Sequence, residues 1–220
     1  YNYTIAGLGS VNISSGKIGN ASLFDGSSTL TNDYDVPLNN ASKSFSIWVN
    51  WSGVGSQNGV LSQGDTSGSG ASWGLWADYG SGKWAFNGYG TGDYETTNTL
   101  VANQWEHVVI TYDGSTIKGY QNGINIFNNT YQLATASGNS YLGSWFDAGN
   151  YYHYEIDAFG EWNRSLSDDE VLQLYNSGSG ITYSEEEPEP PIPFNGNVSS
   201  CSGLQNISSN KTASYQLVND

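Results

Sequence analysis

Apolar and polar residues alternate along much of the first 160 positions of the chain. In residues 44–51, SFSIWVNW, apolar side chains occupy every second position from Phe45 to Trp51, and Ser44, Ser46 and Asn50 lie between them. Alternation with a period of two is typical of a strand with one face on a core and the other toward polar surroundings. The segment therefore predicts a half-buried antiparallel strand.

Similar short segments follow, separated by turn residues. Strands are predicted at 72–78, 83–88, 105–112, 139–145 and 152–162. The pair Asn122-Gly123 supplies the two positive-φ positions of a tight hairpin, before the apolar segment 124–127. Ten to twelve short strands of this kind predict an all-β fold, a two-sheet antiparallel jelly-roll sandwich.

One helix is predicted after the last strand. Ser167 and Glu170 have the spacing of a capping box, and Leu166 and Val171 have the spacing of the hydrophobic contact that accompanies it. The apolar residues of the following turns end near Gly178. We expect this short helix to pack against the sandwich.

The composition divides the chain into three segments. Residues 1–183 form the predicted sandwich, and residues 184–196 form a linker rich in Glu and Pro. Residues 197–220 are interpreted as the start of a second module or as a docking tail. They contain Cys201, the only cysteine, for which a disulfide partner outside this fragment is predicted.

Charge restricts the possible partners. The chain has 21 acidic and 6 basic residues and a net charge of −15, which argues against nucleic acid because phosphate binding needs clustered Lys and Arg. No apolar segment is long enough to span a membrane, so no membrane insertion by this fragment is expected. The opening residues contain no signal peptide, which indicates a mature or excised fragment.

Asn-X-Ser/Thr sequences predict glycosylation and a secreted or cell-surface location. They occur at Asn2, Asn12, Asn20, Asn40, Asn50, Asn128, Asn163, Asn197, Asn206 and Asn210.

Three kinds of candidate site residue stand out. Glu155, Asp157 and Glu161 are at even spacings in one predicted strand, so all three are expected on one face, as in some β-sandwich glycosidases. The two histidines, His107 and His153, have no cysteine nearby, which argues against a zinc site. His107 is expected to be packed or hydrogen-bonded.

Aromatic residues in or beside Gly-rich turns are candidates for ligand binding: Trp73, Trp76, Trp84, Tyr89, Tyr94, Trp145, Tyr151 and Tyr152.

Four ordered motifs carry a family resemblance. They are KIGNASLFDG (17–26), FSIWVNW (45–51), WEHVVITYDG (105–114) with YQNG (120–123), and EIDAFGEWNRSLSDDEVLQLYN (155–176). In this order they resemble the laminin G-like domains of the concanavalin A-like lectin/glucanase superfamily. The resemblance spans about residues 5–178 and implies a jelly-roll sandwich that binds ligands.

The resemblance also bears on chemistry. Glycosidases of this fold carry Glu-x-Asp-x-Glu or a form with one extra residue. Here Phe159 stands where the first form needs Glu, and Glu161 lies one residue beyond the second. At about 6.6 Å per two residues, Glu155 and Glu161 would lie about 20 Å apart, too far for one glycosidic bond. We therefore predict no catalytic residues.

Lectins of this fold often bind calcium at their rims, which makes Asp25 and Asp157 candidate ligands of a structural calcium.

Residues 197–220 weakly resemble the start of a parallel β-helix module of archaeal surface proteins.

The favoured hypothesis is a non-enzymatic extracellular module for adhesion or carbohydrate binding, within a larger glycosylated cell-surface protein. Its partners would be glycans or other surface proteins. The alternative is a glycosylated structural subunit of a surface layer or extracellular filament, which would bind neighbouring copies of itself. A glycoside hydrolase is the third and least favoured hypothesis.

Overall fold

The computed structural model describes residues 4–7, 12–33, 35–53, 58–78, 81–96, 100–146 and 153–181. They belong to one compact unit, Tyr1–Thr182. The predicted linker, the tail and Cys201 lie outside the described residues, so the predictions made for them stay untested.

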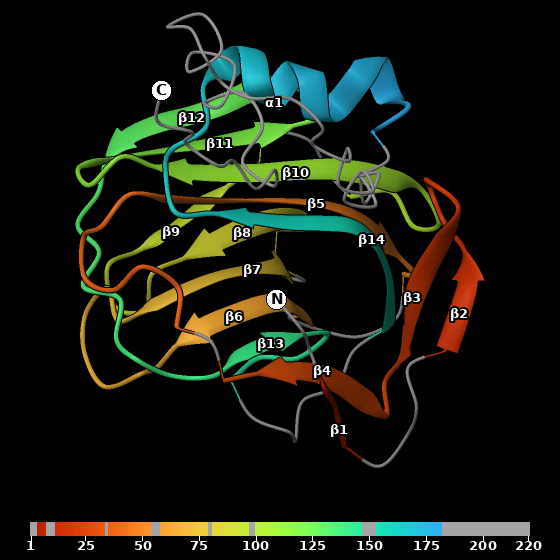
Figure 1. The fold of residues 1–220 in the computed structure, drawn as a ribbon, viewed down its shortest axis with the longest axis horizontal. Helices are drawn as coiled ribbons and strands as arrows, with labels where there is room; N and C mark the ends of the chain where they lie inside the picture. The colour runs from red at the N-terminus through yellow and green to blue at the C-terminus, as the bar shows by residue number, and fades with distance from the viewer. Residues whose placement is uncertain are drawn as a thin grey trace, which may run out of the picture. The chain divides into compact units, whose positions relative to one another are not determined.

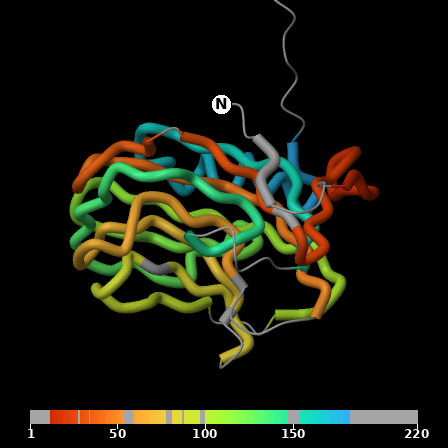
Figure 2. Tube along the Cα trace, turned by 90° about the horizontal axis from the view of Figure 1, so that it is seen from below, coloured from red at the N-terminus to blue at the C-terminus, as the bar shows by residue number. Residues whose placement is uncertain are grey.

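Two seven-stranded antiparallel sheets form a sandwich (Figure 1). Sheet A has the strand order β1 (Thr4–Gly7), β4 (Ser28–Asn32), β13 (Ser140–Leu142), β6 (Asn58–Gly64), β7 (Ser72–Asp78), β8 (Lys83–Asn87) and β9 (Asp93–Glu95). Sheet B has the order β12 (Ile124–Thr130), β11 (Thr116–Gln121), β10 (Trp105–Tyr112), β5 (Lys43–Trp51), β14 (His153–Trp162), β3 (Asn20–Asp25) and β2 (Asn12–Ser15). The hairpin of β2 and β3 stands at the edge of the molecule in both views (Figure 1, Figure 2). The predicted all-β, two-sheet antiparallel sandwich with one short helix is confirmed.

The core lies between the sheets, and its residues follow the predicted alternation. Phe45, Ile47 and Val49 of β5 are fully buried there. The rings of Phe45 and of Trp73 from sheet A pack edge to face, with their centroids 5.6 Å apart.

The prediction of a half-buried strand is wrong for most of β5, because Ser44, Ser46 and Trp48 on its other face are buried as well. Side chains directly opposite in neighbouring strands share a face. Ser46 and Asn50 of β5 therefore point to the outer face of sheet B, together with Val109 and Trp105 of β10.

The helix α1 (Asp168–Tyr175) covers part of this outer face. Val171 and Leu174 pack with Leu166 against Val109 and Tyr120, and burial of each aliphatic side chain stabilises the contact by about 1.5–3 kcal/mol. The predicted capping box is present, because Ser167 and Glu170 each accept a hydrogen bond from the other's backbone N–H.

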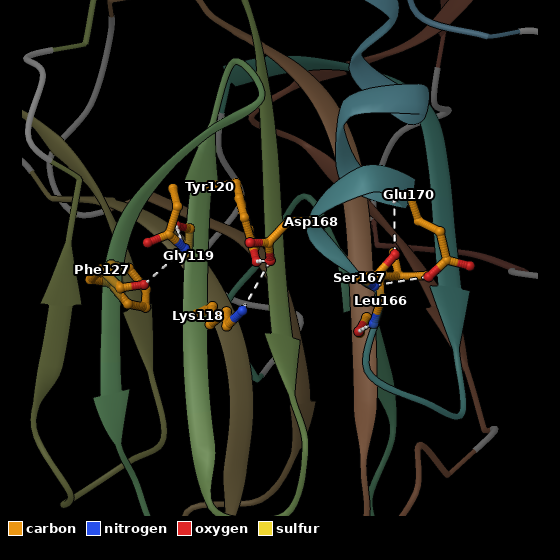
Figure 3. A network of polar contacts seen from close by, with 10 residues as sticks. Lys118, Gly119, Tyr120, Phe127, Leu166, Ser167, Asp168 and Glu170 are labelled. Carbon is orange, nitrogen blue, oxygen red and sulfur yellow. Dashed lines mark hydrogen bonds and ion pairs between the residues drawn. The ribbon is translucent and has the colours of Figure 1, made fainter.

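Polar contacts complete the docking of the helix, as Figure 3 shows. The Tyr120 hydroxyl donates to Asp168 Oδ1 at 2.6 Å, and the Lys118 ammonium lies 2.9 Å from the same oxygen. The helix, the one α-helix of the described residues, has eight residues and is too short to cross a membrane.

An aromatic cluster extends the covered region past the end of α1. The rings of Trp48, His107 and Tyr175 contact one another. The His107 ring centroid lies 5.0 Å from that of Trp48 and 5.9 Å from that of Tyr175, and its Nε2 is 2.8 Å from the Ser46 hydroxyl. Burial lowers the pKa of His107 to about 4, so the imidazole is neutral at neutral pH. The prediction of a packed and hydrogen-bonded His107 is confirmed.

Lys43 is an unusual member of the core, with a side chain only 1% exposed. Its ammonium donates to the carbonyl oxygens of Pro37 and Asn39 and lies 5.7 Å from the ring centroid of Trp73. Burial lowers its pKa from 10.5 to about 8, because removal from water disfavours the charged form.

This burial predicts a dependence of stability on pH. The unfolded chain binds the Lys43 proton more tightly than the folded chain does, so the charged side chain destabilises the fold below pH 8. This destabilisation decreases as the pH rises from 8 toward 10.5. We expect the free energy of unfolding to rise by about 2 kcal/mol between pH 8 and 10. Urea titrations of the wild type and of Lys43→Met measure this, and the variant should lack the rise. Equal pH profiles for the two proteins would contradict the assignment.

Candidate functional site

A bulge in β14 decides where its carboxylates point. Asp157 is opposite Trp48 of β5, but the next described pair is Gly160 with Ser46, so β14 contains one residue more than its partner over this interval. Ala158 in the bulge has a φ of 44°. An extra residue exchanges the two faces for every side chain that follows.

The expectation that Glu155, Asp157 and Glu161 share one face is therefore wrong. Glu155 is opposite Asn50 and faces outward, whereas Glu161 is opposite Phe45 and faces the core side. Glu161 accepts a hydrogen bond from Gln63 of sheet A, and the Asp157 oxygens accept from the backbone N–H groups of Ile18 and Ala158, both at 2.7 Å. Both carboxylates thus support the fold locally.

A polar groove lies on the outer face of sheet B, where the strands β3, β5 and β14 meet the loop that precedes β10. Its volume is about 240 Å³. It is lined by Leu23, Phe24, Asp25, Asn50, Ser52, Asn103, His153, Tyr154 and Glu155. We call these residues the β3–β14 groove.

Register alone brings the main polar groups of the groove together. Asp25 is opposite His153, and Glu155 is opposite both Leu23 and Asn50. Asp25 and Glu155 are therefore diagonal neighbours on one face, at about 7–8 Å. The Asn50 amide donates to Glu155 Oε2 at 2.7 Å, and its Oδ1 is shielded from solvent without a hydrogen-bond partner.

Loop contacts hold the end of the groove. The Asn103 backbone N–H donates to the Trp51 carbonyl oxygen at 2.7 Å, and Asn103 itself has a φ of 60°. The Ser52 hydroxyl donates to the His153 carbonyl oxygen at 3.3 Å. Gly26 has a φ of 83°, and a Cβ there would lie 2.7 Å from Nε2 of His153. A glycine is therefore required for both the turn and the imidazole.

Asp25 is an exposed anion at the rim. Its Oδ1 accepts hydrogen bonds from the Ser27 hydroxyl and backbone N–H, and these bonds lower the pKa of the carboxyl. Trp105, half-buried, is directly opposite Asn50 on the same outer face. The groove thus presents two carboxylates, two amides, a hydroxyl and an imidazole beside an indole ring.

The predicted calcium ligands are not neighbours. Ser22 is opposite Ile156, so Asp157 lies next to Ala21, four residues along β3 from Asp25, or about 13 Å. No group of three or more His, Cys, Asp or Glu suited to a metal occurs among the described residues. Asp25 and Asp157 do not form one calcium site by themselves, and a structural calcium near either residue stays a prediction.

Among the predicted ligand-binding aromatics, Trp73 and Trp84 are core residues. Both are 1% exposed, and the Trp84 indole donates to the buried Glu106 at 2.5 Å. The prediction of a ligand role is wrong for these two, because neither reaches the surface. Alternation had left open which strand aromatics face inward.

The four other described aromatic candidates lie away from the groove. Trp76 and Trp145 are half-buried and meet edge to face at 4.7 Å, with Trp145 against Gly59 and Gly74 of sheet A. Tyr94 stacks on Phe127 at 5.3 Å, and Tyr89 is 40% exposed. Tyr151 and Tyr152 lie outside the described residues. Trp76, Trp145, Tyr94 and Tyr89 are not part of the described lining of the β3–β14 groove.

Sequence reasoning missed the groove itself. It named Asn50 only as a glycosylation site and dismissed Glu155, and it assigned no ligand role to Asn103, Trp105 or His153. One signal was available, namely that Asn50 occupies an outward position of its strand.

A family model now identifies the fold family. The model described as the concanavalin A-like lectin/glucanases superfamily, of laminin G-like type, matches residues 24–172. The chain therefore belongs to this superfamily, as its motifs predicted. The match does not reach residues 197–220, and their resemblance to a parallel β-helix module is not shown. No curated protein matches the chain at a significant level.

Solved structures share the fold at low identity. Domain 4 of AbnA, a GH43 extracellular arabinanase from Geobacillus stearothermophilus solved in complex with arabinotriose, is 19% identical over 81% of this chain and 88% of that chain, with a TM-score of 0.63. The binding domain of Paraclostridial Mosquitocidal Protein 1 is 16% identical over 80% of this chain, with a TM-score of 0.65. Only 48% of that chain is covered, so this chain spans about half of it. A heptameric pentraxin from Limulus polyphemus is 12% identical, over 67% and 75% of the two chains, with a TM-score of 0.52.

The sequons differ in accessibility. Asn12, Asn20, Asn40, Asn128 and Asn163 are exposed, whereas Asn2, Asn197, Asn206 and Asn210 lie outside the described residues. At Asn50 the nitrogen that would carry a glycan donates to Glu155.

We expect glycans at exposed sequons and none at Asn50, because the Asn50 amide is held in the groove. Peptide mapping of protein from its native source, before and after enzymatic deglycosylation, measures this site by site. The mapping would contradict the expectation if Asn50 were occupied or if all five exposed sites were bare.

Proposed function

We propose that this domain is a non-enzymatic saccharide-binding module of an extracellular protein, and that the β3–β14 groove is its binding site. The observation that carries the proposal is the convergence of Asp25, Asn50 and Glu155 beside Trp105. They gather on a sheet face that α1 leaves uncovered.

The chemistry of the groove suits sugars. Saccharide hydroxyl groups both donate and accept hydrogen bonds, and the groove offers carboxylate acceptors with amide groups that do both. An indole face packs against the apolar face of a sugar ring while its edge stays in water. Support comes also from the AbnA domain of the same fold, which was solved with arabinotriose.

Several features favour binding over hydrolysis. Glu155 and Glu161 point to opposite faces of sheet B, so they do not flank one bond. Asp25 and Glu155 have a separation that glycosidases use, about 5–9.5 Å. A general acid, however, needs apolar surroundings that keep it protonated. Asp25 is exposed with a lowered pKa, and Glu155 is only half-buried beside an amide donor.

An extracellular location and a role in adhesion belong to the same proposal. The dense sequons and the net charge of −15 support a secreted glycoprotein. The alternative of a filament or surface-layer subunit depended on residues 184–220, which lie outside the described residues.

A glycan array followed by calorimetry tests the proposed function. We expect Trp105→Ala to weaken binding of the best saccharide at least tenfold, because stacking on the indole is lost, while Trp76→Ala leaves it unchanged. Trp76 is a suitable control because it is also half-buried and lies on sheet A. An array without any bound saccharide, or a loss confined to Trp76→Ala, would overturn the proposal.

Hydrolysis is checked on the same ligand. We expect no product from the wild type. A product whose formation falls by orders of magnitude in Glu155→Gln would establish a glycosidase instead.

A further inference from the structure

The carboxylates of the β3–β14 groove have no Lys or Arg beside them in its described lining. Two carboxylates, Asp25 and Glu155, line it. Asp25 stays ionised near neutral pH, because the Ser27 hydrogen bonds lower its pKa. His153 is the one basic side chain of the lining.

The cations of the described residues have other partners. Lys83, Lys118 and Arg164 form ion pairs with Glu95, Asp168 and Glu170. Lys43 is buried, and Lys17 lies over the ring of Trp48, 4.8 Å from its centroid and outside the groove lining. Apart from His153, the described residues therefore offer the groove no counter-charge.

Among the described residues, only one oxygen of each groove carboxylate accepts a hydrogen bond. The hydrogen bonds to Asp25 involve Oδ1, and the bond from Asn50 to Glu155 involves Oε2. The other oxygens, Oδ2 and Oε1, belong to side chains that are diagonal neighbours on one face. An ammonium group has three N–H donors and no acceptor, so it can donate to both carboxylates at once.

We infer that the groove selects a cationic saccharide, a hexosamine unit whose free ammonium lies between Asp25 and Glu155. This inference rests on the proposed function. A ring amide or hydroxyl at the same position would gain no charge-assisted hydrogen bond. A carboxylate or sulfate would be repelled by both acidic side chains.

The lining residue Asn50 and its cross-strand neighbour Trp105, which lies beside the groove, place the rest of such a sugar. Asn50 and Trp105 are opposite each other on one side of Glu155, where an amide and an indole can contact hydroxyl groups and a ring face. The volume of about 240 Å³ is below the 300–1,000 Å³ typical of pockets for larger ligands, which suits a single ring in an open groove.

The experiment uses three trisaccharides with the same β-1,4 linkage: the trimers of glucosamine, of N-acetylglucosamine and of glucose. Calorimetry in slightly acidic buffer, in which the amino groups are protonated, measures each affinity for the wild type. We expect the glucosamine trimer to bind at least tenfold more tightly than the other two. Asp25→Asn and Glu155→Gln should each reduce that preference at least fivefold, and the double variant should abolish it.

The acidic protein could also attract any cation at long range, so the control must remove one charge elsewhere. Asp65 is matched to Asp25 in its hydrogen bonds, because its Oδ1 accepts from the Ser67 hydroxyl and backbone N–H and these bonds lower the pKa of its carboxyl. Asp65→Asn should leave the preference intact. If Asp65→Asn lowers it as much as Asp25→Asn does, the attraction is non-specific and the inference is wrong.

Two further outcomes separate the inference from the proposed function. Equal binding of all three trimers, lost equally in the groove variants, would overturn the inference and keep the groove as a site for uncharged sugar. Absence of binding to any of the trimers and to any saccharide of the array would overturn both.

Discussion

The extra residue in β14 is the constraint on which the arrangement of sheet B depends. Before the bulge, β14 pairs with both β3 and β5 and places Glu155 on the outer face. After it, Trp162 is opposite Ser44 and faces outward, where it packs with the cluster beneath α1. Without the extra residue Trp162 would turn toward the core and Glu161 toward solvent. One local irregularity thus sets both the docking of the helix and the separation of two carboxylates that look alike in sequence.

The outer face of sheet B is consequently divided between stability and recognition. Leu166, Val171 and Leu174 seal the part over β10 and β11, and the stacked Trp48, His107 and Tyr175 extend that cover. Beyond Trp48 the next outward residue of β5 is Asn50, and the groove begins there. A rigid, well-packed sheet under an open polar surface is a suitable scaffold for ligand binding, because the floor of the site does not have to reorganise.

Local sequence signals predicted most of the fold. The alternation in residues 44–51, the Asn122-Gly123 turn and the Ser167 capping box each depend on neighbours a few residues away, and the structure contains all three. The bulge was not predicted, because the positive φ of Ala158 is imposed by the pairing with β5 and leaves little trace in the residue type. Trp73 and Trp76 lie three positions apart in one predicted strand, but alternation does not say which of the two faces the core.

The groove was out of reach for a different reason. Asp25, Asn50 and Glu155 come from three strands spread over 130 positions, and only the sheet order β5–β14–β3 makes them neighbours. Motif reading grouped Glu155 with Asp157 and Glu161, its neighbours in sequence, whereas its partner in space is Asn50. Family membership identified the fold but left the position of a site on it open.

A crystal structure of the domain with a bound saccharide would show where the ligand lies. We expect electron density for the sugar over Asp25, Asn50 and Glu155, with a ring against Trp105. Density over Trp76 and Trp145 on sheet A, with the β3–β14 groove empty, would contradict this expectation.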